Sequence, residues 1–237
     1  MLNTRFLRIS FYINYIYIYM TKVSPMKVLE LFSGTGSVSK ICKELGWEVY
    51  SVDIDDKLYP VDKKVDILEW DYKSLDFKPD IIWASPPCNT FSKMLFITRT
   101  RDEIIKKMKE EGLPPLYKAR EIIDYFKPKY YFIENPDTGR MKDYINDLPF
   151  YRVSYCRYSD KHSRKDTRIW TNLEGFNPKW CNHKGKHEFG ISASRKHDRM
   201  TSSGRILKKN TIKAISKIQD KYSIPPDLIR DLFICVH

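Results

Sequence analysis

Short apolar runs separated by polar turns recur through the first half of the chain. Residues 27–32, 48–52, 81–84 and 130–133 are the clearest of these runs. Each is rich in Val, Ile, Leu or aromatic residues, which is typical of strands in a buried parallel sheet. Residues 37–45 have helical spacing, and Gly46 follows as a stop signal. The pattern predicts an α/β fold in which strands alternate with helices.

The remaining elements are expected from the same signals. They are a third strand at 66–70, further strands at 151–157 and 167–170, and helices at 101–111, 116–126, 211–222 and 225–233. We expect the Pro-rich stretch 113–116 to separate the first two of these helices, because proline interrupts helical hydrogen bonding.

A glycine-rich turn joins the first strand to the first helix. It reads Ser33-Gly34-Thr35-Gly36, and Asp53 ends the next strand. Glycines let the backbone approach a ligand closely. A carboxylate at the end of the second strand can accept hydrogen bonds from ribose hydroxyls. Pyrophosphate-binding turns often carry a third glycine, but that position is Ser39 here. A plain tight turn is the alternative interpretation.

Two reactive side chains follow neighbouring predicted strands. Cys88 comes after Ser85-Pro86-Pro87, and Glu134 follows the run 130–133. Ligands bind beyond the carboxyl ends of strands in open α/β sheets, so both are expected at one edge. A thiolate can add to carbon 6 of cytosine while a carboxylic acid at nitrogen 3 stabilises the developing charge, which activates carbon 5. The alternatives are a buried structural thiol and an ordinary carboxylate.

These segments resemble the cytosine-C5 DNA methyltransferase family. Glu-Leu-Phe-Ser-Gly-Thr-Gly at 30–36 resembles the first motif of S-adenosylmethionine (SAM)-dependent methyltransferases. Pro-Cys-x-x-Phe-Ser at 87–92 matches the catalytic motif of the family, with Asn89 where Gln is commoner. Glu134-Asn135-Pro136 matches its Glu-Asn-Val motif, with Pro for Val.

Two later segments extend the resemblance from about Lys27 to Phe233. Residues 164–169 resemble the Gln-x-Arg-x-Arg motif, in which Arg168 aligns directly and Arg164 approximately. Residues 224–226 (Ile-Pro-Pro) resemble the last motif, which returns to the SAM pocket. The order of the motifs is that of the unpermuted family.

The resemblance implies a Rossmann-like SAM-dependent methyltransferase sheet with helices on both faces, plus a small basic target-recognition region. The catalytic domain would span 26–171 and 206–237, and the recognition region 172–205. The implied catalytic residues are Cys88 as nucleophile, Glu134 as acid, Asn135, and Arg168 on the cytosine carbonyl or the flipped phosphate. The expected SAM-binding residues are Leu31, Phe32, Ser33, Gly34, Thr35, Gly36, Asp53, Ile54, Asp71 and Pro86. We expect Glu30 to face the cationic methionine end, and Asp71 to accept from the adenine amino group.

The net charge of +12 is concentrated in the last third of the chain. Residues 151–237 hold 19 Lys/Arg and 8 Asp/Glu, whereas residues 1–150 hold 23 and 22. A basic segment on a near-neutral domain favours a nucleic-acid partner, here double-stranded DNA. The expected contact residues are Ser92, Arg164, Lys184, Lys186, Arg195 and Arg199, together with Lys196 and Arg205. The loop from Asn89 to Thr100 is expected to close over the flipped base.

Five cysteines without regular spacing argue against a disulfide framework. Cys181-x-His183-x3-His187, with Cys156 and His197 elsewhere, is compatible with zinc. The spacing matches no recognised zinc finger, and polar loop residues explain it equally, so we assign no metal.

The N-terminal run 9–20 is apolar and rich in tyrosine. It is too short for a membrane span of roughly 20 apolar residues and lacks a signal-peptide cleavage site. We therefore expect residues 1–25 to be a dispensable extension. We also expect the protein to be a monomer without an obligate protein partner or membrane association. The expected location is cytoplasmic or nuclear.

Three other functions remain open. Ser-Pro-Pro-Cys also resembles the Ser-Pro-Pro-Tyr loop of enzymes that methylate exocyclic nitrogens, but those need an aromatic residue and no thiol. A few members of the resembled family methylate tRNA cytosine by the same chemistry. A nucleic-acid-binding pseudoenzyme is the non-enzymatic alternative, because Asn89, Pro136 and the imperfect arginine motif depart from the family pattern.

Overall fold

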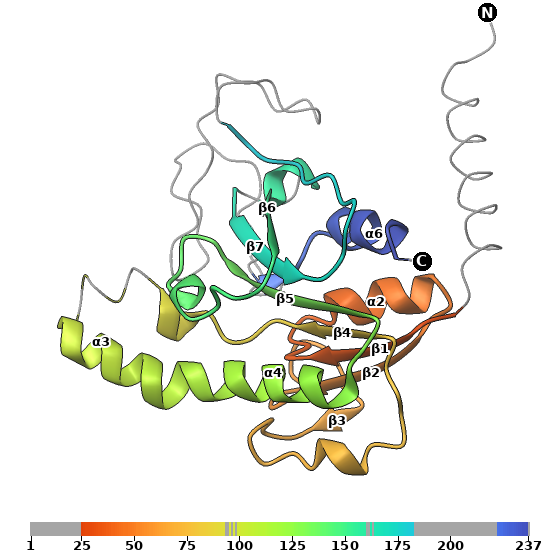
Figure 1. The fold of residues 1–237 in the computed structure, drawn as a ribbon, viewed down its shortest axis with the longest axis horizontal. Helices are drawn as coiled ribbons and strands as arrows, with labels where there is room; N and C mark the ends of the chain where they lie inside the picture. Colours follow the sequence, from red (N-terminus) through yellow and green to blue (C-terminus); the bar gives the residue numbers. More distant parts are fainter. Residues whose placement is uncertain are drawn as a thin grey trace, which may run out of the picture.

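One seven-stranded sheet organises the chain. The computed structural model describes residues 25–92, 95, 97, 99–159, 162, 164–182 and 222–236. The strand order is β3-β2-β1-β4-β5-β7-β6 (Figure 1). The strands are β1 Lys27–Leu31, β2 Glu48–Asp53, β3 Lys63–Lys64, β4 Ile81–Ala84, β5 Tyr130–Pro136, β6 Phe150–Ser154 and β7 Asp166–Thr171. Strands β1 to β5 are parallel, and β7 is antiparallel to both β5 and β6. The carboxyl ends of the five parallel strands therefore share one edge.

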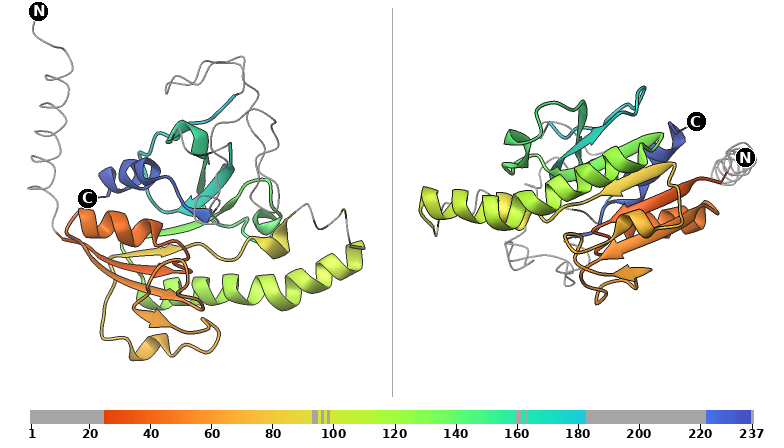
Figure 2. Two further views of the ribbon diagram at one scale, coloured as in Figure 1. Left: turned by 180° about the vertical axis from the view of Figure 1, so that it is seen from behind. Right: turned by 60° about the horizontal axis from the view of Figure 1, so that its bottom comes forward.

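Helices cover both faces of the sheet (Figures 1 and 2). The helical segments are α2 Ser37–Glu44, η1 Tyr72–Ser74, η2 Asn89–Phe91, α3 Arg101–Lys107, η4 Met108–Gly112, α4 Leu113–Phe126, η5 Met141–Asp143, η6 Tyr155–Arg157 and α6 Pro226–Ile234. One apolar core joins the sheet to α2 and α6, and a second joins it to α3 and α4. The predicted Rossmann-like α/β fold is confirmed.

Two strand predictions need correction. The third strand forms at Lys63–Lys64 instead of 66–70. Asp66 accepts a hydrogen bond from the backbone N–H of Leu68 at 2.9 Å, and such a local bond favours a turn over a strand. The strand expected at 151–157 ends at Ser154 and continues as the short helix η6.

The two prolines at 114 and 115 do not separate two helices. The chain passes from α3 through the π-helical turn η4 directly into α4, and the three segments form one long rod (Figure 2). The prolines lie in the first turn of α4, and the wider π turn before them accommodates the missing N–H donors. Helix α3 begins with a capping box between Thr100 and Glu103.

Several predictions lie outside the described residues. They are the extension up to residue 24, the predicted helix at 211–222 up to residue 221, and most of the recognition region 172–205. No helix in the described part of the chain has the length and apolar run needed to cross a membrane.

Candidate active site

The glycine-rich turn after β1 has an unusual backbone. Phe32, Gly34 and Gly36 have φ angles of 59°, 52° and 64°, in the left-handed region that is uncommon for any residue with a side chain. A non-glycine residue held there indicates local strain, which concentrates at functional sites. The ring of Tyr59 lies where a Cβ on Gly36 would be, 2.2 Å from its Cδ1. Position 36 therefore requires glycine for both conformation and space.

The turn presents its backbone and one side chain, that of Phe32, to a ligand. The side chains of Leu31, Ser33 and Thr35 are buried, whereas Phe32 and Gly34 are partly exposed. A bound molecule would therefore meet mainly main-chain groups and the Phe32 ring here.

Glu30 faces the helix α2 instead of the ligand side. Its carboxylate accepts hydrogen bonds from the backbone N–H of Val38 and Ser39 and from the hydroxyls of Ser33 and Ser39. The N-cap of α2 is Gly36, which has no side chain, so Glu30 supplies the missing acceptor for the first turn. Burial raises the pKa of Glu30, against the lowering effect of these bonds. Because Glu30 is only 3% exposed, the expectation that it meets the methionine end is wrong.

Asp53 and Ile54 lie at the carboxyl end of β2. Asp53 accepts from the Gly34 N–H at 2.8 Å through one oxygen and from the Asp55 N–H at 2.9 Å through the other. Each oxygen keeps a further lone pair, so the carboxylate anchors the turn and can still accept from a ligand. Ile54 is 64% exposed, which is high for an isoleucine next to a buried strand. Asp71 is exposed just before η1 and makes no side-chain cap there.

The loop after β4 carries Cys88 and is tied to β5. Pro86 is buried, and its carbonyl accepts a hydrogen bond from Asn135 Nδ2 at 2.9 Å. Beyond Cys88, the N–H of Arg140 donates to the Phe91 carbonyl at 3.0 Å. Both sides of the loop are therefore fixed, while Cys88 itself is partly exposed.

Two residues that were not predicted as site residues contact Glu134. The Tyr155 hydroxyl donates to Glu134 Oε1 at 2.8 Å, and Lys165 Nζ lies 3.6 Å from the same oxygen. Burial raises the pKa of Tyr155 well above its usual range, and the charges of Glu134 and of an ionised Cys88 raise it further. One buried phenol thus lies in the electrostatic field of both predicted catalytic groups. The prediction that strands β4 and β5 bring Cys88 and Glu134 to one site agrees with this geometry.

Arg168 does not lie on the face of the sheet that carries Glu134. In the antiparallel pairing of β5 with β7, Glu134 lies opposite Ile169, and Arg168 lies opposite Asn135. Directly paired residues project to the same face, and successive residues alternate. Arg168 therefore shares the face of Asn135. This placement does not support the expected contact between Arg168 and the cytosine carbonyl beside Glu134. The alternative contact with the phosphate of the flipped nucleotide stays a prediction.

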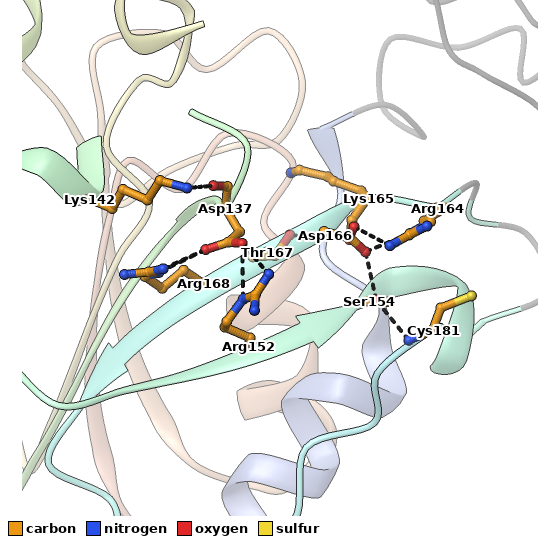
Figure 3. A network of polar contacts seen from close by, with 10 residues as sticks. All are labelled: Asp137, Lys142, Arg152, Ser154, Arg164, Lys165, Asp166, Thr167, Arg168 and Cys181. Atoms are coloured by element: carbon orange, nitrogen blue, oxygen red, sulfur yellow. Dashed lines mark hydrogen bonds and ion pairs between the residues drawn. The ribbon is translucent and has the colours of Figure 1, made fainter. Parts of the chain in front are cut away.

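Arg168 instead belongs to an ion-pair cluster around Asp137 (Figure 3). Arg168 and Arg152 lie opposite each other on β7 and β6, and each contacts one oxygen of Asp137 at 2.8 Å. Burial tends to raise the pKa of Asp137, but Arg168, Arg152 and Lys142 lower it overall. The guanidinium of Arg168 also stacks on Phe150 at 3.8 Å from the ring centroid. The cluster joins the two antiparallel strands next to the site.

The predicted DNA contacts are only partly described. Arg164 forms a two-point ion pair with Asp166, at 2.9 and 2.6 Å, and its side chain is only 17% exposed. Ser92 is partly exposed at the end of η2. The other expected contacts lie outside the described residues: Lys184, Lys186, Arg195, Lys196, Arg199 and Arg205.

Two of the cysteines in the possible zinc set are neighbours. Cys156 and Cys181 are both buried, and burial together with Cys181 raises the pKa of Cys156 to about 12. His183, His187 and His197 lie outside the described residues. Within the described ranges, no three His, Cys, Asp or Glu side chains are grouped to hold a metal ion.

The fold and this site define the class of protein. SAM-dependent methyltransferases of the Rossmann-like type typically have a parallel sheet with a glycine-rich turn after β1 and a carboxylate after β2. Their reactive groups follow β4 and β5, as they do here. The sequence model of the C-5 cytosine-specific DNA methylases matches residues 26–148. A protein of Frog virus 3 (isolate Goorha), named "Probable DNA (cytosine-5)-methyltransferase", is 44% identical over 222 residues, which cover 87% of this chain and 98% of that protein. The chain belongs to the C-5 cytosine-specific DNA methylase family.

Solved structures match part of the chain at low identity. The Entamoeba histolytica methyltransferase EhMeth has a TM-score of 0.49 and 16% identity, covering 66% of this chain and 56% of its own. A Spodoptera frugiperda DNMT2 mutant has a TM-score of 0.39 and 16% identity, covering 66% and 53%.

Proposed function

We propose that the protein transfers a methyl group from SAM to carbon 5 of a flipped-out cytosine in duplex DNA, with Cys88 as nucleophile and Glu134 as acid. The observation that carries the proposal is the shared site of these two groups. Residues Ala84 and Ile133, which precede their segments, are paired partners on β4 and β5, and Asn135 bonds directly to the Cys88 loop.

The residues around the first turn fit SAM. The exposed apolar side chain of Ile54 can pack on the adenine ring, and Asp53 can accept from the ribose hydroxyls. The left-handed turn from Phe32 to Gly36 exposes main-chain groups for the methionine portion. Asp71 is exposed and can reach for the adenine amino group. When bound, SAM supplies an electrophilic methyl group.

The side chains of this protein then perform the remaining chemistry. The Cys88 thiolate forms a bond to carbon 6 of the cytosine, and Glu134 gives a proton to ring nitrogen 3, so that electron density reaches carbon 5. After carbon 5 is methylated, its proton is lost to solvent or a base, and the Cys88–carbon 6 bond breaks. Nitrogen 3 returns its proton to Glu134 as the aromatic ring is restored. Burial of the carboxyl group excludes water and strengthens its hydrogen bond to the base.

Sequence recognition is assigned to the basic region 172–205, and the enzyme acts as a monomer in the compartment, cytoplasm or nucleus, that contains its DNA. The target base must leave the helical stack, at a cost of a few kcal/mol. Basic side chains of this region offset that cost by contacts with the backbone phosphates.

Tritium transfer from labelled SAM into duplex DNA tests the proposal, with Cys88→Ser beside the wild type and tRNA as a parallel substrate. The expected result is label in DNA that maps to 5-methylcytosine and disappears in the Cys88→Ser variant. Label only in tRNA would keep the mechanism and change the substrate. Label that survives Cys88→Ser would contradict the thiol mechanism, and no label anywhere would favour a binding protein.

A further inference from the structure

Two side chains contact the same oxygen of the Glu134 carboxylate. Its oxygen Oε1 accepts from the Tyr155 hydroxyl at 2.8 Å and lies 3.6 Å from the Lys165 ammonium. Among the described residues, both of these partners contact Oε1, so Oε2 is the oxygen left for another molecule. The side chain of Glu134 is only 7% exposed, and Tyr155 is 1% exposed. The carboxylate therefore has a fixed orientation in a site from which solvent is largely excluded.

Tyr155 and Lys165 also contact each other. The backbone N–H of Tyr155 donates to the Lys165 carbonyl at 3.0 Å, and the ammonium lies 4.7 Å from the centroid of the Tyr155 ring. The hydroxyl of the buried Thr167 adds a further hydrogen bond to the Tyr155 phenol. Tyr155 and Lys165 thus form a rigid bracket, which we call the Glu134 bracket.

The Glu134 bracket is linked to the loop of the nucleophile. Asn135, next to Glu134, donates to the Pro86 carbonyl in the Cys88 loop at 2.9 Å. The charges of Glu134 and of an ionised Cys88 both raise the pKa of Tyr155, which agrees with this placement. Arg168, the cation expected from the sequence motif, contacts Asp137 on the other face of the sheet. Within the described part of the chain, Lys165 is thus the cation paired with Glu134.

We propose that Lys165 and Tyr155 are positioning residues for methyl transfer, which hold Glu134 by Oε1 so that Oε2 meets ring nitrogen 3 of the cytosine. This inference rests on the proposed function. As the thiolate adds to carbon 6, the proton on Oε2 passes to nitrogen 3 and leaves a carboxylate. The Lys165 ammonium and the Tyr155 hydroxyl stabilise that carboxylate, and they therefore favour the transfer of the proton to the base.

The first test needs no substrate. In protein labelled with ¹³C at the glutamate carboxyl carbons, the Glu134 resonance is assigned by its loss in Glu134→Gln. In Lys165→Met this resonance changes its chemical shift at constant pH, because the ammonium that lies 3.6 Å from Oε1 is removed. In Tyr155→Phe it also changes, because the hydrogen bond to Oε1 is lost.

Two matched variants separate this effect from a general change in charge or folding. Lys27→Met removes an ion pair of similar length, 3.5 Å to Glu48, at the opposite ends of the strands. Tyr158→Phe removes the hydroxyl of another buried tyrosine, which accepts from the Lys179 N–H. Neither variant changes the Glu134 chemical shift. An unchanged chemical shift in both Lys165→Met and Tyr155→Phe overturns the proposal.

The kinetic test uses methyl transfer to DNA. Lys165→Met lowers kcat roughly tenfold or more, as the loss of proton-transfer assistance predicts, while KM for DNA changes much less. Lys165→Arg restores most of the rate, since it keeps the charge. A methylating wild type whose Glu134 resonance is unchanged in both Lys165→Met and Tyr155→Phe refutes the bracket alone. A changed resonance without any methylation refutes the proposed function and, with it, the role in transfer.

Discussion

The amide of Asn135 donates to the carbonyl of Pro86 at 2.9 Å and so joins the strand of Glu134 to the loop of Cys88. Both residues are buried, and the bond crosses between β5 and the loop after β4. Reactive groups from separate segments need such a tie because catalysis is sensitive to small displacements.

Asn135→Ala removes this tie. The unpaired Pro86 carbonyl costs about 1–3 kcal/mol of stability. A Cys88 loop displaced by about 1 Å can lower kcat on the order of 100-fold. Urea unfolding and methyl-transfer rates measure the two effects. The matched control is Asn172→Ala, whose side chain bonds to the backbone of Tyr131 and Lys129 at the other end of β5. Equal activity losses in the two variants would rule out a specific role for the tie.

Gly112→Ala tests the contact between the π turn and the catalytic loop. A Cβ at Gly112 would lie 2.3 Å from Thr90 Oγ1 and 3.0 Å from the Phe91 ring, so the loop next to Cys88 must shift. Overpacking of this kind costs about 1–3 kcal/mol, and we expect kcat to fall as well. Gly46→Ala is the control, because Gly46 has a φ of 71° but no neighbour within 4 Å. It loses roughly 1–2 kcal/mol of stability from its conformation and keeps its kcat. If Gly112→Ala also kept wild-type kcat, the π turn would have no influence on the loop.

Ile54→Ala weakens SAM binding without destabilising the free protein. The side chain is 64% exposed, so little buried contact is lost in the fold, whereas a bound adenine would cover it. Loss of about 1.4 kcal/mol of this packing raises the Kd about tenfold, which isothermal titration calorimetry measures. Tyr117→Ala, an exposed apolar residue of α4, leaves the Kd unchanged. Equal Kd values for wild type and Ile54→Ala would show that adenine binds elsewhere.

Asp137→Asn destabilises the protein in a pH-dependent way. The charged hydrogen bonds to Arg152 and Arg168 are lost, at a cost of about 1.5–3 kcal/mol near neutral pH. The pKa of Asp137 is lowered in the folded protein, so its stabilisation is complete above the unfolded value of about 3.9 and is lost as pH falls toward the folded value. The stability difference between wild type and variant is therefore constant from pH 7 to 5 and shrinks below pH 4 in urea unfolding. The exposed pair Arg140–Asp143 provides the control Asp143→Asn, with a much smaller change. A difference that grew on acidification would contradict the assignment.

The sequence was sufficient to predict the parallel sheet and the pairing of the strands that precede Cys88 and Glu134, since apolar runs and strand ends are encoded locally. The surroundings of Glu134 and of Arg168 were not predictable in the same way. In a strand, a shift of one residue moves a side chain to the other face, and alignment to an arginine motif selected Arg168 although the pairing register places it opposite Asn135. Lys165, three residues earlier, precedes β7 and reaches Glu134, while Tyr155 comes from a segment that was expected to continue as a strand. The role of Glu30 was also hidden, because a buried carboxylate that caps a helix and one that faces a ligand have the same sequence pattern.

The covalent bond between Cys88 and the target cytosine can be trapped directly. In duplex DNA that carries 5-fluorocytosine, carbon 5 holds fluorine in place of the proton that must leave, so the adduct persists after methylation. Mass spectrometry of the digested complex with SAM should locate the nucleotide on the peptide that contains Cys88, and Cys88→Ser should give no adduct. Methylation of ordinary DNA without any such adduct, or an adduct on a different residue, would contradict the role of Cys88 as nucleophile.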